Sequence, residues 1–540
     1  MYSLNPKDLK SFVKNILKGR VQLSDCDGYT SASIIYQYSH DINPNCQIDY
    51  WLHEGKQHGL QDHIDRLLNE NIHYDLIILP DSSSNDAHYH DMLDGINIPC
   101  LILDHHLTDV PLSDNAIIVN NQLSSNYDNK ELTGAGVTYQ FCRFVDEKLK
   151  SNYADKYLDL AALGIIGDMG SVLELENRYI IYQGLHQITN DFFRCLLEKA
   201  AYSITGKMGA SWSEILAKTN PISVAFYVVP MVNALIRVGS MEEKDLLFQA
   251  FINGATLVPC NKRGAKGTLE RADIEAARVC TNAKSHQNKM LDDMMDRMEG
   301  KIYKYGLLDN KILFIRLEEE KFPPEINGLL AMKLASKYKK PTIVTRLNDE
   351  GYDRGSIRGL NNSALTSFKQ FLTDSGYFEY VLGHANAAGC SILDKNLRDF
   401  HEYANNKLKN IDFGENCYDV NFERVGTDKD IVDLIFDLCK FDGVWGQLNN
   451  EPLIHVSNIK IHPYEIRIMG SNQDTVKIEY CGVSYLKFHA KDLINEIQQC
   501  NGEISLEIVG RANLNEWMGQ RSAQILIDDY EIKTKKITEF

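Results

Sequence analysis

The stretch "LILDHHLTD", residues 101–109, is the most informative short segment of this chain. Its aliphatic residues stop abruptly at Asp104, His105 and His106, which is the pattern of a buried strand with polar groups at its carboxyl end. An acid and two imidazoles clustered after a buried run are costly unless a ligand or partner satisfies them. The stretch therefore predicts a buried strand that presents a binding group at one edge of a sheet.

Similar segments surround this strand on both sides. β-rich runs at 20–25, 47–52, 75–81, 100–106 and 115–121 are separated by helical patterns. This alternation predicts βαβ units, and hence an α/β fold with a mainly parallel sheet covered by helices. Ligands of such sheets bind beyond the carboxyl ends of the strands.

Acids and imidazoles recur at these predicted strand ends. Asp25 and Asp27 follow the first run, Asp81 ends a later one, and Asp168 ends the apolar segment "LAALGIIGD". Together with His105 they offer oxygen and nitrogen ligands that suit Mn²⁺, Mg²⁺ or Zn²⁺. Two bridged divalent ions stabilise both the attacking and the leaving oxygen of a phosphoryl displacement. The pattern predicts metal-assisted hydrolysis of a phosphoester.

Each piece has a purely structural alternative when it is taken alone. An Asp-x-Asp-Gly sequence is usually a turn, and an aspartate such as Asp81 ahead of "SSSND" is often a helix N-cap. A histidine pair is more often a satisfied surface or core pair. Their conjunction at successive strand ends favours the metal site.

Several motifs carry a resemblance to a known family. "DCDG" (25–28), "LPDSSSND" (79–86), "LDHH" (103–106) and "GIIGDMG" (164–170) resemble the four motifs of the DHH phosphoesterase superfamily. "GHANAAG" (383–389) resembles the signature of the associated C-terminal domain, and residues 509–529 resemble the RecJ OB domain. The chain is therefore similar to the RecJ branch, whose members are 5′-to-3′ exonucleases of single-stranded DNA.

The resemblance implies roles for individual residues. It implies two Mn²⁺ or Mg²⁺ ions and makes these residues their ligands: Asp25, Asp27, Asp81, His105 and Asp168. Asp81 and Asp168 would bridge the ions, Asp104 would support the histidine pair, and His106 would face the scissile phosphate. Residues implied to bind the substrate are Asn233, Arg237, Arg358, Gly383 and His384.

The chain departs from the family pattern at two positions. Leu23 stands where RecJ proteins usually have the earliest acid of the first motif, so the first ion is expected to bind weakly. Leu382 replaces the first glycine of the associated-domain signature, which bears on the phosphate pocket.

We expect four parts in the 540 residues. They are a phosphoesterase domain (1–195), a helical connector (196–300), a smaller α/β substrate-binding domain (301–412) and a β-barrel of OB type (413–540). Residues after Pro6 predict a packed first helix. The charged, Met-containing stretch after 270 predicts a connecting helix between domains, and a solvated spacer is favoured over any part in the active site.

Composition restricts the class of protein and the cellular compartment in which it is expected. No apolar run approaches the roughly 20 residues that span a bilayer, so we expect no membrane protein. Twelve cysteines without a C-x-x-C pair indicate a reducing cytoplasm rather than a disulfide framework. The net charge of −17 opposes loose adhesion to nucleic acid, although a local basic groove can outweigh it. The acidic composition also favours a monomer.

Single-strand binding requires cations for the backbone and aromatic rings for the bases. Two segments offer them, through Lys262, Arg263, Lys266, Arg511, Trp517 and Arg521. The first segment is equally compatible with a solvated turn and helix start. For Trp517 we favour a position in the barrel core or at a domain interface over a stacking platform.

Three hypotheses for function follow. The leading one is a metal-dependent exonuclease that degrades single-stranded DNA to 5′-mononucleotides, whose partners would include a single-strand-binding protein or a helicase. The second is a phosphodiesterase of short oligoribonucleotides or cyclic dinucleotides, which would not need the β-rich tail. The third is a catalytically silent single-strand-binding scaffold, for which Leu23 is the best support.

Overall fold

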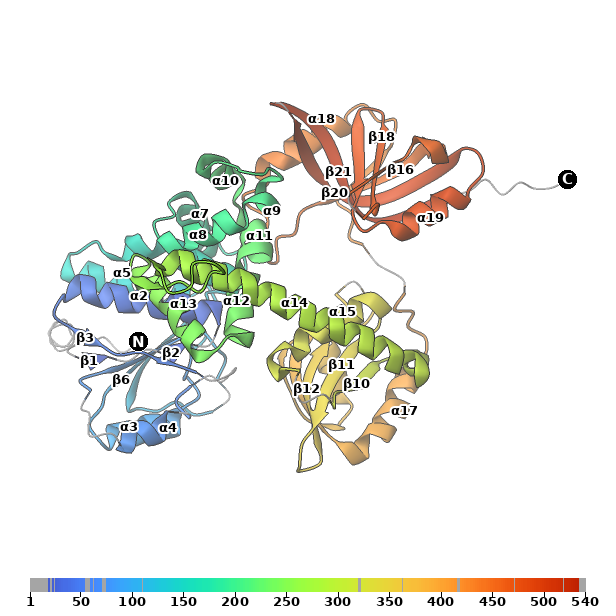
Figure 1. Cartoon of the computed structure of the whole chain (residues 1–540). Coiled ribbons are helices and arrows are strands. Elements are labelled where there is room, and N and C mark those ends of the chain that lie inside the picture. The colour runs from blue at the N-terminus through green and yellow to red at the C-terminus, as the bar shows by residue number, and fades with distance from the viewer. Residues whose placement is uncertain are drawn as a thin grey trace. The chain divides into compact units, whose positions relative to one another are not determined.

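The structure is a computed structural model, shown in Figure 1. It describes residues 18–19, 22–23, 25–53, 59–61, 63–69, 74–108, 110–318, 322–361, 363–414, 418–470, 472–517 and 519–533. The helix expected near the N-terminus lies outside these residues. Two compact units divide the chain, residues 1–416 and 417–540.

Parallel strands form the N-terminal part, as the sequence predicts. β6 pairs with β5 on one side and with β7 on the other, and the shorter pairs β1–β3 and β2–β4 are parallel as well. The strands are β1 (Lys18–Gly19), β2 (Gln22–Leu23), β3 (Gln47–Ile48), β4 (Trp51–Leu52), β5 (Ile77–Pro80), β6 (Cys100–Asp104) and β7 (Ala116–Asn120). All residues of β5 and β6 are buried, which is typical of a parallel sheet.

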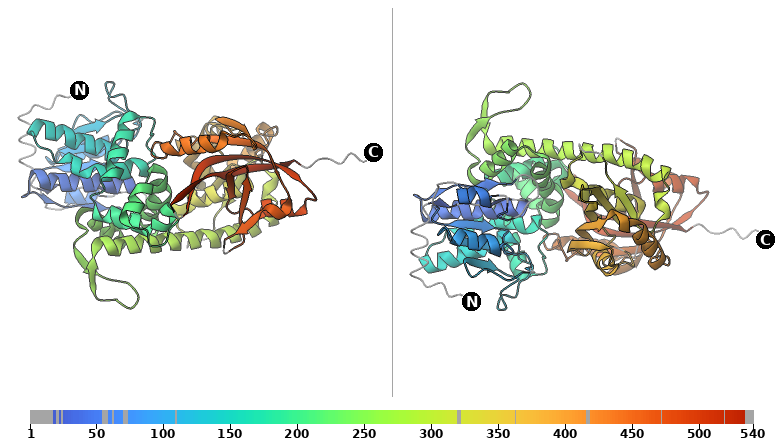
Figure 2. Two further views of the ribbon diagram at one scale, coloured as in Figure 1. Left: turned by 90° about the horizontal axis from the view of Figure 1, so that it is seen from above. Right: turned by 90° about the horizontal axis from the view of Figure 1, so that it is seen from below.

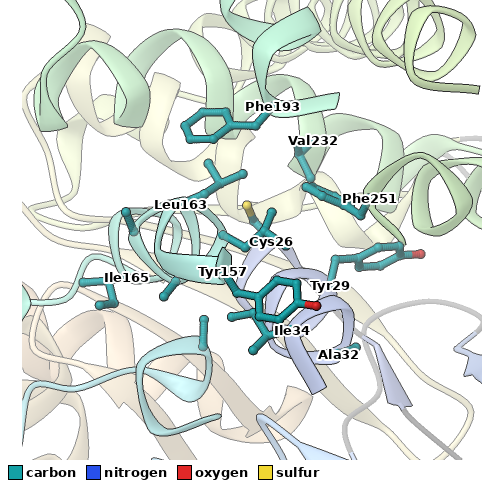
Figure 3. Packing of buried hydrophobic residues seen from close by; sticks show 14 of the residues in the cluster. Cys26, Tyr29, Ala32, Ile34, Tyr157, Leu163, Ile165, Phe193, Val232 and Phe251 are labelled. Carbon is teal, nitrogen blue, oxygen red and sulfur yellow. The ribbon is translucent and has the colours of Figure 1, made fainter. Parts of the chain in front are cut away.

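Helices follow these strands and continue far beyond them. The first set is α2 (Cys26–Ile42), α3 (Ile64–Asn69), α4 (Ala87–Asp94), α5 (Gly134–Leu149) and α6 (Leu158–Gly167). The next is α7 (Leu175–His186), α8 (Asp191–Lys199), α9 (Ala201–Thr205), α10 (Trp212–Lys218), α11 (Pro221–Ser223), a π-helical turn (Val224–Val228), α12 (Val229–Val238) and α13 (Met241–Asn253). Their apolar faces form one core with α2, in which Cys26, Leu163, Phe193 and Val232 lie close together (Figure 3).

One helical run among the described residues, Pro221–Val238, is long and apolar enough to cross a bilayer. Just over half of it, 56%, is buried inside the protein, and its members Val224, Val228 and Val232 belong to the core around α2. This burial is typical of a core helix of a globular domain.

The long helix α14 (Ala272–Lys304) connects this core to a second sheet. Leu291, Met294 and Met298 of α14 are buried against β10 and α15, so this part of the helix packs against a domain and is no solvated spacer. The second sheet has the order β10-β11-β12-β14-β13, with only β10 and β11 parallel. The elements are β10 (Leu313–Arg316), α15 (Asn327–Tyr338), β11 (Thr342–Leu347), β12 (Tyr352–Arg358), α16 (Phe368–Asp374), β13 (Phe378–His384), β14 (Ala387–Leu393) and α17 (Leu397–Lys407).

The C-terminal unit has its own sheet and its own hydrophobic core. Seven strands pair in the order β15-β16-β20-β21-β19-β18-β17, and no described ladder joins β15 to β17. They are β15 (Phe422–Val425), β16 (Leu453–Ile461), β17 (Arg467–Met469), β18 (Thr475–Tyr480), β19 (Val483–Lys487), β20 (Ile504–Trp517) and β21 (Gln520–Lys533), with helices α18 (Ile431–Leu438) and α19 (Lys491–Gln499). The β-rich pattern after residue 412 is thus explained by a separate β unit.

Candidate metal centre

The candidate metal centre lies where β5 and β6 end side by side. Asp81 follows β5 directly, and its backbone N–H donates to the carbonyl oxygen of Leu103 on β6 over 2.8 Å. Asp81 has a φ of 59°, in the left-handed region that a non-glycine residue rarely adopts. It is not a helix N-cap, because Asp86 occupies that position of α4. Strain of this kind clusters at functional sites.

His105 lies between two carboxylates from different elements. Its Nε2 atom is 3.2 Å from Oδ1 of Asp81 and 3.5 Å from Oδ2 of Asp168, which caps the C-terminal end of α6. Two overlapping groups have ligand atoms within 4.8 Å of one another, Asp81 with His105 and His106, and Asp27 with His105 and Asp168. The structure therefore brings four of the five expected ligands together.

The N-terminal end of α5 holds Asp27. The carboxylate accepts hydrogen bonds from the N–H groups of Gly134 and Ala135, over 2.7 and 3.0 Å, and from the hydroxyl of Thr133 over 3.0 Å. A helix N-terminus stabilises such an anion. The segment "LTGAG" that supplies these donors contains the N-cap of α5, Thr133, and its first residues, so a helix-start pattern is its signal in the sequence.

Two glycines make room for these carboxylates. A Cβ atom on Gly134 would lie 2.5 Å from Oδ1 of Asp81, and one on Gly164 would lie 2.5 Å from Oδ1 of Asp27. Real Cβ atoms do not approach oxygen so closely. Both positions therefore require glycine for a reason that belongs to the site.

The acidic groups of the site repel one another in a buried setting. Burial raises the pKa of Asp81 well above its ordinary value, and the charges of Asp27 and Asp25 add to this. Burial also raises the pKa of Asp27, and it raises the pKa of Asp168 to about 7 with a contribution from Asp27. Three carboxyl groups thus resist ionisation unless a cation joins them.

Asp104 organises the loop that carries both histidines. Its Oδ1 lies 2.7 Å from Nδ1 of His106 and accepts the backbone N–H of His105, while Oδ2 accepts the N–H of Ser84. Burial alone would raise the pKa of Asp104, but these hydrogen bonds and the adjacent imidazoles hold it below its ordinary value. The bond to Asp104 likewise raises the pKa of His106 against the effect of burial.

Asn120 completes this loop from the end of β7. Its Nδ2 donates to Oγ of Ser84 and to the carbonyl oxygen of His106, both over 2.9 Å. Neither Asn120 nor Ser84 was among the residues expected from the sequence. The signal of Asn120 was its position in "VNN" at a third parallel strand end, and that of Ser84 was its place in "LPDSSSND" after β5.

Asp25 has a structural role in addition to its charge. It is the N-cap of α2, with its Oδ1 accepting the N–H of Gly28 over 3.0 Å. Oδ1 of Asn233 accepts the N–H of Cys26 over 3.2 Å. The charge of Asp25 also opposes the lowering of the pKa of Arg237 that burial causes. Asp25, Asn233 and Arg237 therefore border the carboxylate group without belonging to the two ligand groups.

The expected phosphate-binding residues meet at one edge of the second sheet. Arg358 ends β12, His384 ends β13, and Ala387 of β14 pairs with both of them. Gly383 has a φ of 133°, and a Cβ there would lie 2.8 Å from the carbonyl oxygen of Ala387. Burial lowers the pKa of Arg358, and the positive charge of Arg237 lowers it further. The two guanidinium groups therefore repel each other.

The basic candidates are divided between the two units. Lys262, Arg263 and Lys266 are exposed on the loop between β8 (Leu257–Pro259) and β9 (Leu269–Arg271). In the C-terminal unit, Arg511 is bound by Asp528 through two hydrogen bonds of 3.0 and 2.7 Å and by Glu451 over 3.1 Å. Arg521 lies 3.5 Å from Glu516, and the side chain of Trp517 lies outside the described part.

The residues present fit a divalent cation. Ligands on adjacent corners of an octahedron with 2.0–2.1 Å bonds are roughly 3 Å apart, close to the 3.2 and 3.5 Å separations around His105. Oδ1 of Asp81 is buried and accepts no hydrogen bond from the described residues, although it faces this group. Carboxylates with imidazole suit Mn²⁺, and none of the ligand atoms in these two groups is a thiolate.

Comparisons with known proteins identify the family of the chain. The description "DHH family, N-terminal domain" matches residues 22–165, and "RecJ OB domain" matches residues 428–529. The provisionally named SPbeta prophage-derived single-strand DNA-specific exonuclease of Bacillus subtilis is 35% identical over 522 residues, which are 96% of this chain and 87% of that protein. The single-stranded-DNA-specific exonuclease RecJ of the same species is 26% identical, over 94% of this chain and 60% of that protein.

Solved structures share the fold. RecJ from Thermus thermophilus in complex with Mn²⁺ matches with a TM-score of 0.72 at 17% identity, over 98% of this chain and 72% of that one. An exonuclease RecJ bound to manganese matches with a TM-score of 0.53 at 19% identity, over 74% and 94%. The chain belongs to the RecJ-like exonuclease branch of the DHH family.

Proposed function

We propose that this chain is a metal-dependent exonuclease that degrades single-stranded DNA from the 5′ end and releases 5′-mononucleotides. The observation that carries the proposal is the pair of ligand groups that share His105. The relatives named as single-strand DNA-specific exonucleases support the substrate class, and the relatives solved with Mn²⁺ support the ion. Direction rests on the family resemblance alone.

Asp27, Asp81, Asp168 and His105 would hold two Mn²⁺ or Mg²⁺ ions, with Asp25 adding negative charge beside them. Bound divalent ions supply Lewis acidity at the phosphate and generate a nucleophile at neutral pH. Leu23 stands at the position of a family acid, so one of the two ions would bind more weakly than the other.

The chain's own residues would position the strand. Asp104 fixes the orientation of His106 and favours its protonated form, so the imidazolium can donate to a phosphate oxygen. Arg358, with Gly383 and His384 beside it, would bind the adjacent phosphates, and Arg237 would link this pocket to the metal centre. Asn233 would act indirectly, by holding the first N–H of α2.

The domain roles follow the same division. Residues 1–195 would carry out hydrolysis, 196–300 would connect, 301–412 would bind substrate phosphates and 413–540 would bind the strand. A monomer in the cytoplasm that works with a single-strand-binding protein or a helicase fits the acidic composition and the free cysteines among the described residues.

Oligonucleotides labelled at one end test the proposal. With Mn²⁺ and a 5′-labelled single strand, we expect a labelled mononucleotide from the first turnover, whereas a 3′-labelled strand should shorten gradually. Release of the 3′ label first would reverse the direction. Hydrolysis of cyclic dinucleotides without any action on long strands would favour the small-substrate alternative, and strand binding without hydrolysis would favour a silent scaffold.

A further inference from the structure

The β8–β9 hairpin is a basic projection from an otherwise acidic chain. Lys262, Arg263 and Lys266 lie within five residues at its tip, all exposed, and residues 254–269 contain no acid. The whole chain carries a net charge of −17. Both views of Figure 2 show the hairpin, in light green, extending beyond the neighbouring helices. A local concentration of positive charge is thus presented away from the acidic body.

Backbone hydrogen bonds give the hairpin a defined shape. The N–H of Cys260 donates to the carbonyl oxygen of Thr268 over 2.7 Å, and the N–H of Ala265 donates to that of Lys262 over 3.0 Å. Gly264 and Gly267 have φ values of 87° and 91°, which these tight turns require. The tip is therefore folded, and its cations are held at fixed positions along the backbone.

The acids at the base of the hairpin are already partnered. Glu275 accepts the N–H of Asn261 and pairs with Arg278, and Glu270 lies 3.4 Å from the thiol of Cys260. By contrast, the described residues provide no ion-pair partner for the three tip cations. Their charge is available to an external anion.

The hairpin leads directly into α14, which carries a further cation, Lys284. Lys284 lies twelve residues after the first residue of α14, or about 18 Å along the helix axis. Burial lowers its pKa, and the positive charges of Arg237 and Lys333 contribute to the lowering. α14 thus joins the hairpin to this group of cations over the length of a few nucleotides.

We propose that the hairpin tip, Lys262, Arg263 and Lys266, binds phosphates of the nucleic-acid strand beyond the nucleotides held at the metal centre. The identity of the polyanion rests on the proposed function. An arm of this kind strengthens binding of long strands and leaves short substrates unaffected, because only a long strand reaches it. An acidic protein partner is the alternative that the experiment excludes.

Salt-dependent binding of strands to the full chain tests the proposal. Fluorescence anisotropy of strands of about 30 and about 4 nucleotides would be measured between roughly 50 and 200 mM salt, in an Asp81→Ala background that prevents degradation. Each phosphate contact with a single strand contributes about 0.7 to the salt slope, so three contacts contribute about 2. Raising the salt from roughly 50 to roughly 200 mM weakens binding of the long strand. This weakening should be roughly 20-fold smaller for the variant without the hairpin cations than for the chain that keeps them.

The matched variants are Lys262→Ala/Arg263→Ala/Lys266→Ala and a control, Lys395→Ala/Arg398→Ala/Lys409→Ala, which removes the same number of exposed lysines and arginines elsewhere. We expect a change only for the hairpin variant and only with the long strand. An unchanged slope for that variant, or an equal change in the control, would overturn the proposal and would leave an acidic protein as the partner to seek. In the active chain, the hairpin variant should raise KM for the long strand without changing kcat on the short one.

The two proposals fail separately. Absence of Mn²⁺-dependent degradation by the unmodified chain would refute the proposed function, even if the hairpin contributes to strand binding. Normal degradation with an unchanged salt slope would refute the hairpin arm alone. A chain that binds no strand would refute both.

Discussion

At the residue scale, the energetically unfavourable features of the metal centre are concentrated in Asp81. The residue combines a left-handed backbone, burial of all but 3% of its side chain and an Oδ1 atom that accepts no hydrogen bond from the part of the chain that the structure describes. The sequence predicts its position, because it ends an apolar strand. It could not predict the strained backbone or the contact with Gly134, since both depend on how α5 packs against β5.

Gly134→Ala should impair the site without unfolding the domain. The added Cβ would have to displace the Asp81 carboxylate, with which it would overlap at 2.5 Å. We expect Mn²⁺ affinity to fall by about tenfold or more, as for groups that orient metal ligands. Isothermal titration calorimetry measures it. The control is Gly300→Ala, a helical position with nothing within 4 Å, which should leave affinity unchanged; equal effects would contradict the account.

The raised pKa of Asp168, about 7, couples metal binding to pH. In the metal-free chain the folded state keeps a proton that the unfolded state loses near pH ~4, so this group's contribution to stability falls as pH rises from about 4 to about 7. Asp27 and Asp81 act in the same direction. Mn²⁺ requires the ionised forms, so its affinity should rise with pH over this range.

Thermal unfolding from about pH 5 to about pH 8, with EDTA or with Mn²⁺, measures this linkage. Stabilisation by Mn²⁺ should grow with pH, and the Asp168→Asn variant should show a flatter pH dependence in EDTA. The same pH dependence in the variant and the unmodified chain would mean that Asp168 does not titrate in this range.

At the element scale, opposite ends of two helices meet at the site. The N-terminus of α5 stabilises the Asp27 anion, whereas Asp168 lies at the C-terminus of α6, where a negative charge is unfavourable. Alternation of strands and helices was predictable from the sequence because each element has its own periodicity. Which helix ends face the sheet edge was not, since it depends on tertiary packing.

The connecting helix gives a second test at this scale. Met298 is fully buried between α14 and the second sheet, so Met298→Ala should destabilise the chain by about 2–5 kcal/mol. Denaturant unfolding measures this. Lys289→Ala, at an exposed position on the same helix, should change stability by less than about 0.5 kcal/mol. Similar small effects in both variants would contradict the packing of α14 against the second sheet.

At the scale of the whole molecule, each unit has its own core. The buried residues around Ile454 and Ile508 all belong to the C-terminal unit. The β-rich composition predicted this unit, but the ion pairs of Arg511 with Asp528 and Glu451 were hidden from the sequence because they join distant segments. Arg511, which was expected to contact nucleic acid, thus forms ion pairs within its own unit.

Separate cores make the C-terminal unit removable in principle. A chain ending at Asn416 should retain turnover of a dinucleotide and lose affinity for a strand of about 30 nucleotides by roughly tenfold or more, since the unit that we propose to bind the strand is gone. Steady-state kinetics on both substrates distinguishes these effects. Unchanged turnover of the long strand would favour the small-substrate phosphodiesterase.

The most direct test of the central claim is degradation of a single-stranded oligonucleotide across a Mn²⁺ titration, for the unmodified chain and for Asp81→Ala. The account predicts release of mononucleotides that saturates with metal, at a concentration raised by the leucine at position 23, and no release by the variant. Equal degradation by both proteins, or none by the unmodified chain at any Mn²⁺ concentration, would contradict it.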